Sequence, residues 1–542
     1  MKLRKPLIAV AVIAAPFFTV HGAARADDIT KLRQQAADLK KHNKSLEKRL
    51  DQLERQSAAK RAAQVPASDS FLASATKGPV EAIAGDGPIT WHGITLFGTI
   101  DAGAGWQSHG LPANPNIYAA ATLIGPNNNR AYFGPVPNGL QQSVIGLKGE
   151  EEILPGLAGV FYAGAGIVPT SGQLANAPGS LINQNGLSRY VYSNYADGSR
   201  GGQAFNDGLY AGLSSKTFGT LTFGRHRNFG GDTMIAYDPA GGSYAFSVIG
   251  ISGAAAGGGD TENVRWDNSL KYKVSYGPVH FGAMYKFADG SGGSNVGNAN
   301  TPTILYTPHN DAYQFILGGD YQGLSVDAIA GHYNQAISAR ILSAAQLAGT
   351  STFISTENAV KTTTGNINAN TLAGVVTDNT NLLIAAKYTW NQFKFFGGYE
   401  HVLMQNPHDS LGIGAQVQGG YALSSVNNHS VGSDKSVNYF WTGVKYAYNP
   451  NLDLTVSYYH VLQNAYVGPA PGSAKVVAAC SNTSAANCSG TLDAASFYGD
   501  YHFNKHFDVY AGVFWSSVSN GLASGYLYHV EWAPSFGARY TF

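Results

Sequence analysis

The stretch Gly537-Ala538-Arg539-Tyr540-Thr541-Phe542 alternates apolar and polar residues and ends on an aromatic residue. A strand of this kind is typical of the closing strand of a transmembrane β-barrel in a Gram-negative outer membrane. The beginning of the chain agrees with this interpretation. Basic residues within 2–5 precede an apolar run over 7–20 and the small-residue pattern of 24–26. We therefore predict a secretory signal peptide at 1–26.

Composition favours a barrel over a helical membrane protein. The apolar run of the signal peptide, about 14 residues, is too short to span a bilayer as a helix, and no other segment approaches ~18 apolar residues. Only 13% of the residues are charged, while Gly (66) and Tyr (31) are abundant. Strands that alternate between lipid and a polar lumen account for the near-zero mean hydropathy of −0.12. The alternative is a secreted β-sandwich or solenoid.

The net charge of +1 conceals two regions of opposite sign. Residues 27–61 carry ten Lys and Arg against six Asp and Glu, whereas residues 62–542 carry 21 against 28. Nucleic acid is not an expected partner of an exported chain. We expect the basic segment to meet acidic cell-wall or lipid groups instead.

The segment after the cleavage site predicts a coiled coil at 27–57. Its core positions follow a heptad repeat: Ile29, Leu32, Ala36, Leu39, Asn43, Leu46, Leu50 and Leu53. The narrow apolar stripe favours an oligomer, and the alternative is a monomeric amphipathic helix on the barrel or membrane. Residues 58–92 are rich in Ala, Ser, Gly and Pro, which predicts a flexible linker.

From residue 93 onward, alternating segments predict an all-β transmembrane barrel of sixteen antiparallel strands. We expect strands at 93–106, 142–151, 157–168, 205–216, 218–227, 263–275, 277–288, 311–321, 323–334, 379–390, 392–403, 436–448, 452–463, 494–503, 506–518 and 529–542. Their connections alternate between short turns and long Gly/Asn/Ser-rich loops. This predicts periplasmic turns, extracellular loops and a periplasmic N-terminus. A barrel of this size leaves an aqueous channel.

Four stretches carry a resemblance to a known family: Gly93–Asp101, Val144–Glu150, Ala211–Arg225 and Arg265–Tyr272. They resemble the first strands and the loop-3 hairpin of the Gram-negative general diffusion porins, nearest the neisserial and Burkholderia type. The resemblance covers 93–290 well and the last strands moderately. The coiled coil lies outside the usual pattern of this family.

The resemblance implies a homotrimer that lets small hydrophilic solutes and ions diffuse passively. We expect no cofactor and no metal. It implies that loop 3, here 228–262, folds into the lumen and that Arg225 lies at a subunit contact. Expected partners are outer-membrane lipid, lipopolysaccharide and the barrel-assembly machinery, which would recognise the strand ending at Phe542.

Strand parity and loop 3 predict the pore-lining residues. They are Lys148, Glu150, Asp207, Asp232, Asp238, Asp260, Glu262, Arg265, Asp267, Lys271 and Lys273. Val144 and Asp207 stand where many relatives carry inward arginines. Since loop 3 has acids and no Lys or Arg, we expect a weak preference for cations.

The sequence is also compatible with two more specific functions. The protein could be a porin selective for a sugar or an anion, or its coiled coil could also tether the outer membrane to peptidoglycan. Catalysis is not expected, because His280 and His460 have no nucleophile signature near them. Cys480 and Cys488 are predicted to form a disulfide, since an exported chain meets an oxidising compartment.

Overall fold

The computed structural model describes residue 34 and residues 89–108, 131–170, 172–174, 204–248, 264–288, 293–296, 303–306, 310–341, 372–408, 414–418, 421–426, 433–466, 489–520 and 529–542. The predicted signal peptide, coiled coil and disulfide lie outside these residues, apart from Gln34, which is helical. Met1–Ala84 and Gly85–Phe542 are separate compact units. No helix among the described residues has the length and apolar character needed to cross a membrane.

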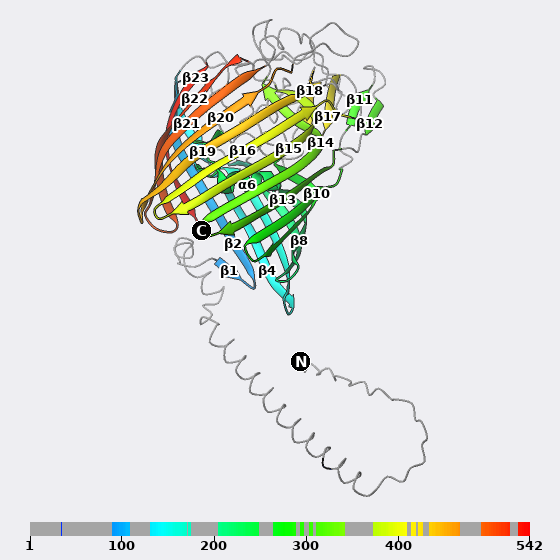
Figure 1. Cartoon of the computed structure of the whole chain (residues 1–542), viewed down its shortest axis with the longest axis vertical. Coiled ribbons are helices and arrows are strands. Elements are labelled where there is room, and N and C mark those ends of the chain that lie inside the picture. The colour runs from blue at the N-terminus through cyan, green and yellow to red at the C-terminus, as the bar shows by residue number, and fades with distance from the viewer. Residues whose placement is uncertain are drawn as a thin grey trace. The chain divides into compact units, whose positions relative to one another are not determined.

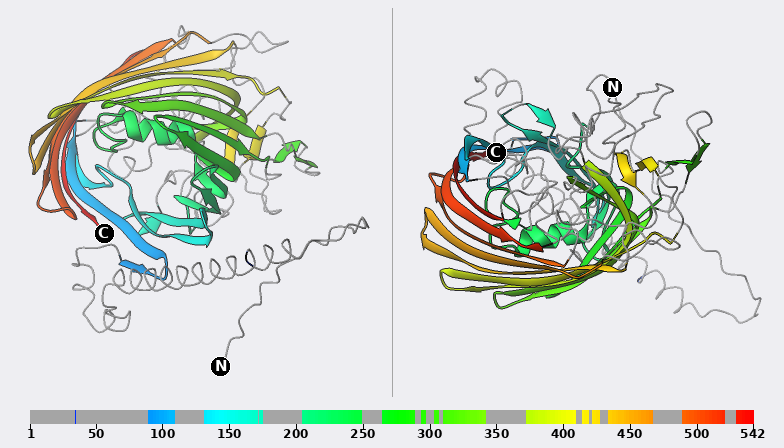
Figure 2. Two further views of the ribbon diagram at one scale, coloured as in Figure 1. Left: turned by 60° about the horizontal axis from the view of Figure 1, so that its bottom comes forward. Right: turned by 90° about the horizontal axis from the view of Figure 1, so that it is seen from above.

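The second unit is a closed barrel of sixteen strands within the described residues (Figures 1 and 2). In order around the ring they are β2 (Ile94–Gln107), β4 (Ser143–Leu154), β5 (Leu157–Val168), β7 (Gly208–Ser215), β8 (Gly219–Arg227), β9 (Arg265–Tyr276), β10 (Val279–Lys286), β13 (Ala312–Tyr321), β14 (Leu324–Ile341), β15 (Leu372–Trp390), β16 (Phe393–Gln405), β19 (Lys435–Asn449), β20 (Leu452–Gln463), β21 (Gly490–His502), β22 (Phe507–Val518) and β23 (Val530–Thr541). Each pairs antiparallel with the next, and β23 pairs with β2. The predicted sixteen-stranded antiparallel barrel is confirmed.

The described residues also form short strands that the sequence pattern did not predict. They are β1 (Ile89–Trp91), β3 (Tyr132–Pro137), β6 (Gln173–Leu174), β11 (Gly293–Val296), β12 (Thr303–Tyr306), β17 (Gly414–Gln418) and β18 (Tyr421–Val426). β1 pairs with β2 and lies in the stretch predicted to be linker. β14 and β15 extend well beyond their predicted limits at 334 and 379.

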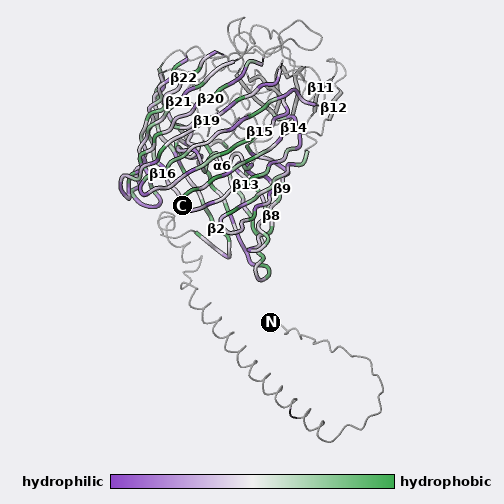
Figure 3. The backbone as a smooth tube through the Cα atoms, viewed as in Figure 1, coloured by the Kyte–Doolittle hydropathy of each residue, from purple (hydrophilic) through white to green (hydrophobic). Residues whose placement is uncertain are grey.

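Hydrophobic and hydrophilic residues alternate along the strands of the wall (Figure 3). On β4, Ile145 and Leu147 are exposed on the outer face, while Val144 and Lys148 border an internal cavity. The outer face of β13 likewise exposes Leu317. Apolar side chains outside and polar ones inside are what lipid and an aqueous lumen require.

Candidate channel constriction

Residues 228–248, the described part of loop 3, run inside the barrel and begin with the helix α6 (Phe229–Tyr237). Asn228 caps this helix by accepting a hydrogen bond from the N–H of Gly231 at 2.8 Å. The sequence pattern did not predict a helix here. α6 packs on the inner side of β13–β16, while β2–β5 lie across the lumen from it (Figure 2).

Side chains of the wall hold loop 3 in place after α6. The indole of Trp441 donates to the carbonyl of Tyr237 at 3.0 Å. The hydroxyl of Tyr459 donates to the carboxylate of Asp238 at 2.7 Å. Positive φ angles at Gly241 and Gly242 (64° and 73°) then turn the chain, a conformation that glycine adopts without strain.

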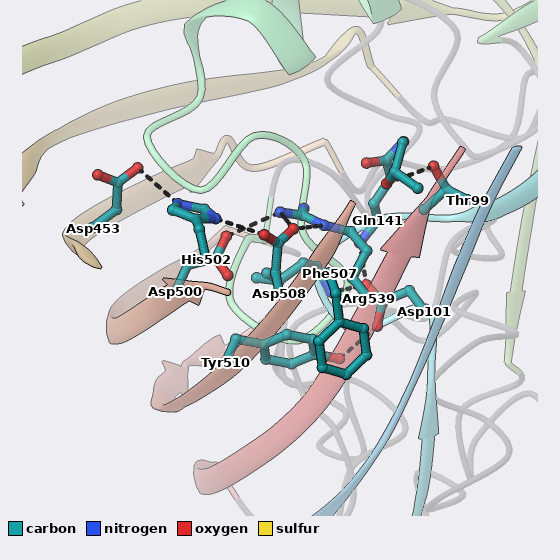
Figure 4. A network of polar contacts seen from close by, with 12 residues as sticks. Thr99, Asp101, Gln141, Asp453, Asp500, His502, Phe507, Asp508, Tyr510 and Arg539 are labelled. Carbon is teal, nitrogen blue, oxygen red and sulfur yellow. Dashed lines mark hydrogen bonds and ion pairs between the residues drawn. The ribbon is translucent and has the colours of Figure 1, made fainter. Parts of the chain in front are cut away.

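A second inward element faces loop 3. It is the bulge formed by residues 138–142, between β3 and β4. The backbone N–H groups of Leu140 and Gln141 donate to the buried carboxylate of Asp101, each at 2.8 Å, and Tyr510 donates to its other oxygen at 2.7 Å (Figure 4). The hydroxyl of Ser243 in loop 3 donates to the carbonyl of Gly139 at 2.7 Å. The bulge and loop 3 therefore support each other.

These two elements and the wall enclose a cavity of about 840 Å³. Six basic residues line it: Lys148, Arg227, Arg265, Lys394, Lys445 and Arg539. Four acidic residues line it: Asp207, Asp238, Asp453 and Asp500. Cations outnumber carboxylates, and Asp238 is only 2% exposed.

Asp207 lies immediately before β7, and two guanidinium groups contact its carboxylate. Arg265 contacts its carboxylate at 2.6 Å and Arg227 at 3.4 Å, and Tyr162 donates to it at 2.6 Å. Burial by itself would raise the pKa of Asp207. The charges of Arg265 and Arg227 outweigh burial and hold this pKa well below its ordinary value. The single carboxylate of Asp207 cannot neutralise both guanidinium groups, so this cluster keeps a net positive charge.

Asp232 on α6 is shared in the same way. Lys271 contacts its carboxylate at 2.6 Å and Lys273 at 3.2 Å. Burial acts to raise the pKa of Asp232, but these lysines and Arg227 lower it well below its ordinary value. Asp232 is not among the residues that line the cavity. Its ion pairs with these lysines hold α6 to the wall.

A third network crosses β20–β23 (Figure 4). Arg539 donates to Asp508 at 2.7 Å and to Asp500 at 3.0 Å. His502 contacts Asp508 at 2.6 Å and Asp453 at 3.6 Å. Here carboxylates outnumber guanidinium groups, so the positive excess of the cavity lies with Lys148, Arg227 and Arg265 on β4, β8 and β9 and with Lys394 on β16.

The structure separates the predicted pore-lining residues into groups. Lys148, Asp207, Asp238 and Arg265 border the cavity. Asp232, Lys271 and Lys273 form the ion-pair cluster beside it. Glu150 is exposed on β4 but does not border it, and Asp260 and Glu262 lie outside the described residues.

Two predictions at this site need correction. Asp267 does not border the cavity but forms an ion pair with Arg225 in the wall. A register shift between β8 and β9 and a positive φ of 49° at Asn268 break the parity on which that prediction relied. The acids of loop 3 were expected to be uncompensated, but Asp232 is paired and Asp238 is buried against the wall.

Arg225, expected at a subunit contact, is engaged within its own chain. It donates to the carbonyl of Asn206 at 2.9 Å and pairs with Asp267.

Four basic residues of the cavity were missed. Lys394, Lys445 and Arg539 have inward parity in predicted strands, so alternation alone could have identified them. Arg227 could not be found in this way. It shares the outward parity of Phe223 but lies at the end of β8, where its side chain turns toward Asp207.

The family model for Gram-negative porins matches residues 62–521. The chain belongs to the Gram-negative porin family. Porins are channel proteins of the outer membrane and not enzymes, in agreement with the channel predicted from the sequence. An outer membrane porin protein of Bordetella pertussis is 26% identical to this porin over 249 residues, 45% of this chain. That match spans 56% of the relative, little more than half of its length.

Solved structures are similar to this porin at low sequence identity. An anion-selective porin from Comamonas acidovorans is 15% identical, with a TM-score of 0.49 over 83% of this chain and 99% of that chain. The outer-membrane protein OmpT of Vibrio cholerae, in its trimer form, is 12% identical, with a TM-score of 0.46 over 83% and 99% of the two chains.

Proposed function

We propose that this porin is a channel for passive diffusion of small hydrophilic solutes, with a modest preference for anions. The observation that carries the proposal is the lining of the cavity, where six Lys and Arg face four Asp. A few uncompensated charges inside a low-dielectric wall bias which ions enter. This replaces the cation preference that loop 3 alone suggested.

Two lysines carry much of this bias. Lys148 and Lys394 lie over the rings of Phe97 and Phe396, at 5.6 and 5.9 Å from the ring centroids. Neither forms an ion pair among the described residues. Their positive charges are therefore available to permeating anions.

Reversal potentials across planar bilayers in a KCl gradient test the proposal. We expect wild-type channels to favour chloride, and the double variant Lys148→Gln/Lys394→Gln to shift toward potassium. Lys216→Gln, in a short turn away from the cavity, should behave as wild type. A wild-type channel that favours potassium would refute the proposal. Salt shortens the Debye length from about 10 Å at 0.1 M to about 3 Å at 1 M, so the preference should fade as salt rises.

We also propose a homotrimer of the neisserial and Burkholderia type. The outer face of β2 and β5 includes small residues, among them Ala102, Ala104, Ala163 and Ala165, beside the larger Ile145 and Leu147 of β4. β13–β21 expose large side chains such as Leu317 and Phe440. Small side chains allow another barrel to approach closely, while large ones suit lipid and lipopolysaccharide. Chemical cross-linking in native membranes should yield trimers. We further propose that the barrel-assembly machinery recognises β23 when the barrel is inserted into the membrane.

A second candidate role rests on the heptad of residues 27–57. We propose that this basic segment forms a periplasmic coiled coil that binds peptidoglycan. Sedimentation of the porin with purified peptidoglycan, with and without residues 27–60, tests it. Equal sedimentation of both forms would rule out the tether while leaving the channel untouched.

A further inference from the structure

The side of α6 that borders the cavity is apolar. Ile235 and Ala236 are its exposed residues there, and Ile235 is 42% exposed. The acids on either side of them do not compete for this surface. Asp232 is held by two lysines, and Asp238 is buried among hydrogen bonds from the wall. Loop 3 therefore contributes an aliphatic surface to the passage where a charged one was expected.

The wall across the lumen from α6 is cationic and carries aromatic rings. Lys148 lies over Phe97, and the ring of Phe97 stacks on that of Tyr162 with centroids 5.2 Å apart. Arg227 and Arg265 contact Asp207, the acceptor for Tyr162, while their backbones lie beside the start of α6. Phe97 and Tyr162 both border the cavity with these cations. Positive charge and ring surface thus meet on one side, opposite the aliphatic surface of loop 3.

We propose that the constriction favours carboxylates that carry an apolar body, in particular an aromatic ring. A carboxylate can accept charge-assisted hydrogen bonds from the wall cations. The body of the same molecule can cover Ile235 and the neighbouring rings, which removes apolar surface from water on both partners. This inference rests on the proposed anion-favouring channel and names the class of solute within it.

A simple halide or acetate gains only the electrostatic part of this interaction, because it has no body to cover the apolar surface. A neutral aromatic alcohol gains only the apolar part. Phenylacetate has both features and acts as the probe. Each feature can therefore be tested separately with small soluble compounds.

The experiment measures the block of KCl current through the purified full-length porin in planar bilayers. We expect phenylacetate to reach half-block at a concentration about tenfold below that of acetate or of benzyl alcohol. The Ile235→Asn variant should reduce this advantage severalfold, while Ile235→Leu should retain it. Ile153→Asn, an exposed position at the end of β4, should match wild type.

Equal half-block concentrations for phenylacetate and acetate would overturn the inference, as would an unchanged advantage in Ile235→Asn. The reversal potential in KCl alone tests the anion preference in the same bilayers. A channel that prefers chloride but does not distinguish the two carboxylates would refute this inference and leave the proposed function intact. A channel that prefers potassium would refute the proposed function itself.

Discussion

Asp207 and Asp232 show how single residues acquire an electrostatic role that their charge alone does not reveal. Each is an acid in or beside the constriction, and each is shared by two basic side chains. Their negative charge is therefore more than compensated locally. The sign of the potential in the passage follows from the pairing, and a count of acids in loop 3 gives the opposite answer.

The lowered pKa of Asp232 predicts how the channel responds to acid. A carboxylate whose pKa falls on folding stabilises the folded state above its ordinary pKa of 3.8 and loses that effect as pH falls toward the lowered value. We expect steady conductance between about pH 7 and about pH 5, with increased current noise below about pH 4 as α6 loosens.

Single-channel recordings over a pH series test this, with Asp232→Asn as the comparison. In that variant the noise should already be raised at neutral pH and should change less on acidification. A noise transition centred near neutral pH in the wild type would show that another group controls loop 3.

At the scale of elements, the bulge of residues 138–142 depends on one carboxylate. Asp101→Ala removes the acceptor for the N–H groups of Leu140 and Gln141. The N–H of Leu140 is buried, and a buried donor left without a partner costs about 1–3 kcal/mol. We expect Asp101→Ala to unfold at a lower temperature than wild type when heated samples are compared by gel electrophoresis. Its single-channel conductance should be larger, because the bulge no longer narrows the passage.

Asp101→Asn serves as the matched variant, because its amide oxygen can still accept from the bulge. It should lie between wild type and Asp101→Ala in both measurements. If Asp101→Ala unfolds at the wild-type temperature with unchanged conductance, the bulge is held by other contacts.

The seam between β2 and β23 should tolerate no added side chain at its centre. Gly103 faces Gly537 across it, and a Cβ at Gly103 would lie 2.1 Å from the carbonyl oxygen of Phe536. Gly397 on β16 has its nearest neighbour at 3.7 Å. We expect Gly103→Ala to reduce the fraction of folded barrel, as measured by gel electrophoresis of unheated samples. Gly397→Ala should fold normally. Equal folding of both would mean that the seam can widen without loss.

The sequence predicted the elements better than the site. Two-residue alternation and short turns identify strands because the wall has lipid on one face and solvent on the other. Parity put Lys148 on the inner face, where it borders the cavity, and could also have found Arg539. It failed at Asp267, because a bulge shifts the register there. α6 is stabilised by contacts with Trp441 and other distant wall residues, which leave no local pattern.

At the scale of the whole molecule, the coiled coil and the barrel are predicted to assemble independently. The heptad of residues 27–57 should set an oligomer that matches the proposed trimer of barrels. Replacing Leu39 and Leu46 with Asp places charges in the apolar core, so the isolated segment should become monomeric. Sedimentation equilibrium of a 27–60 peptide measures this. The barrel of the full chain should still cross-link as a trimer. A wild-type peptide that is monomeric at high micromolar concentration would contradict the coiled coil.

The seam also predicts an order of events during folding. Thr99 and Thr541 meet across it although 442 residues separate them in the chain. Closing so long a loop has a large entropic cost that no local contact repays in advance. Until β23 arrives, β2 and β22 each present an open strand edge, which invites pairing with other chains. A chain that loses β23 to proteolysis during export would keep those edges permanently. Such fragments should aggregate unless chaperones or proteases of the periplasm remove them.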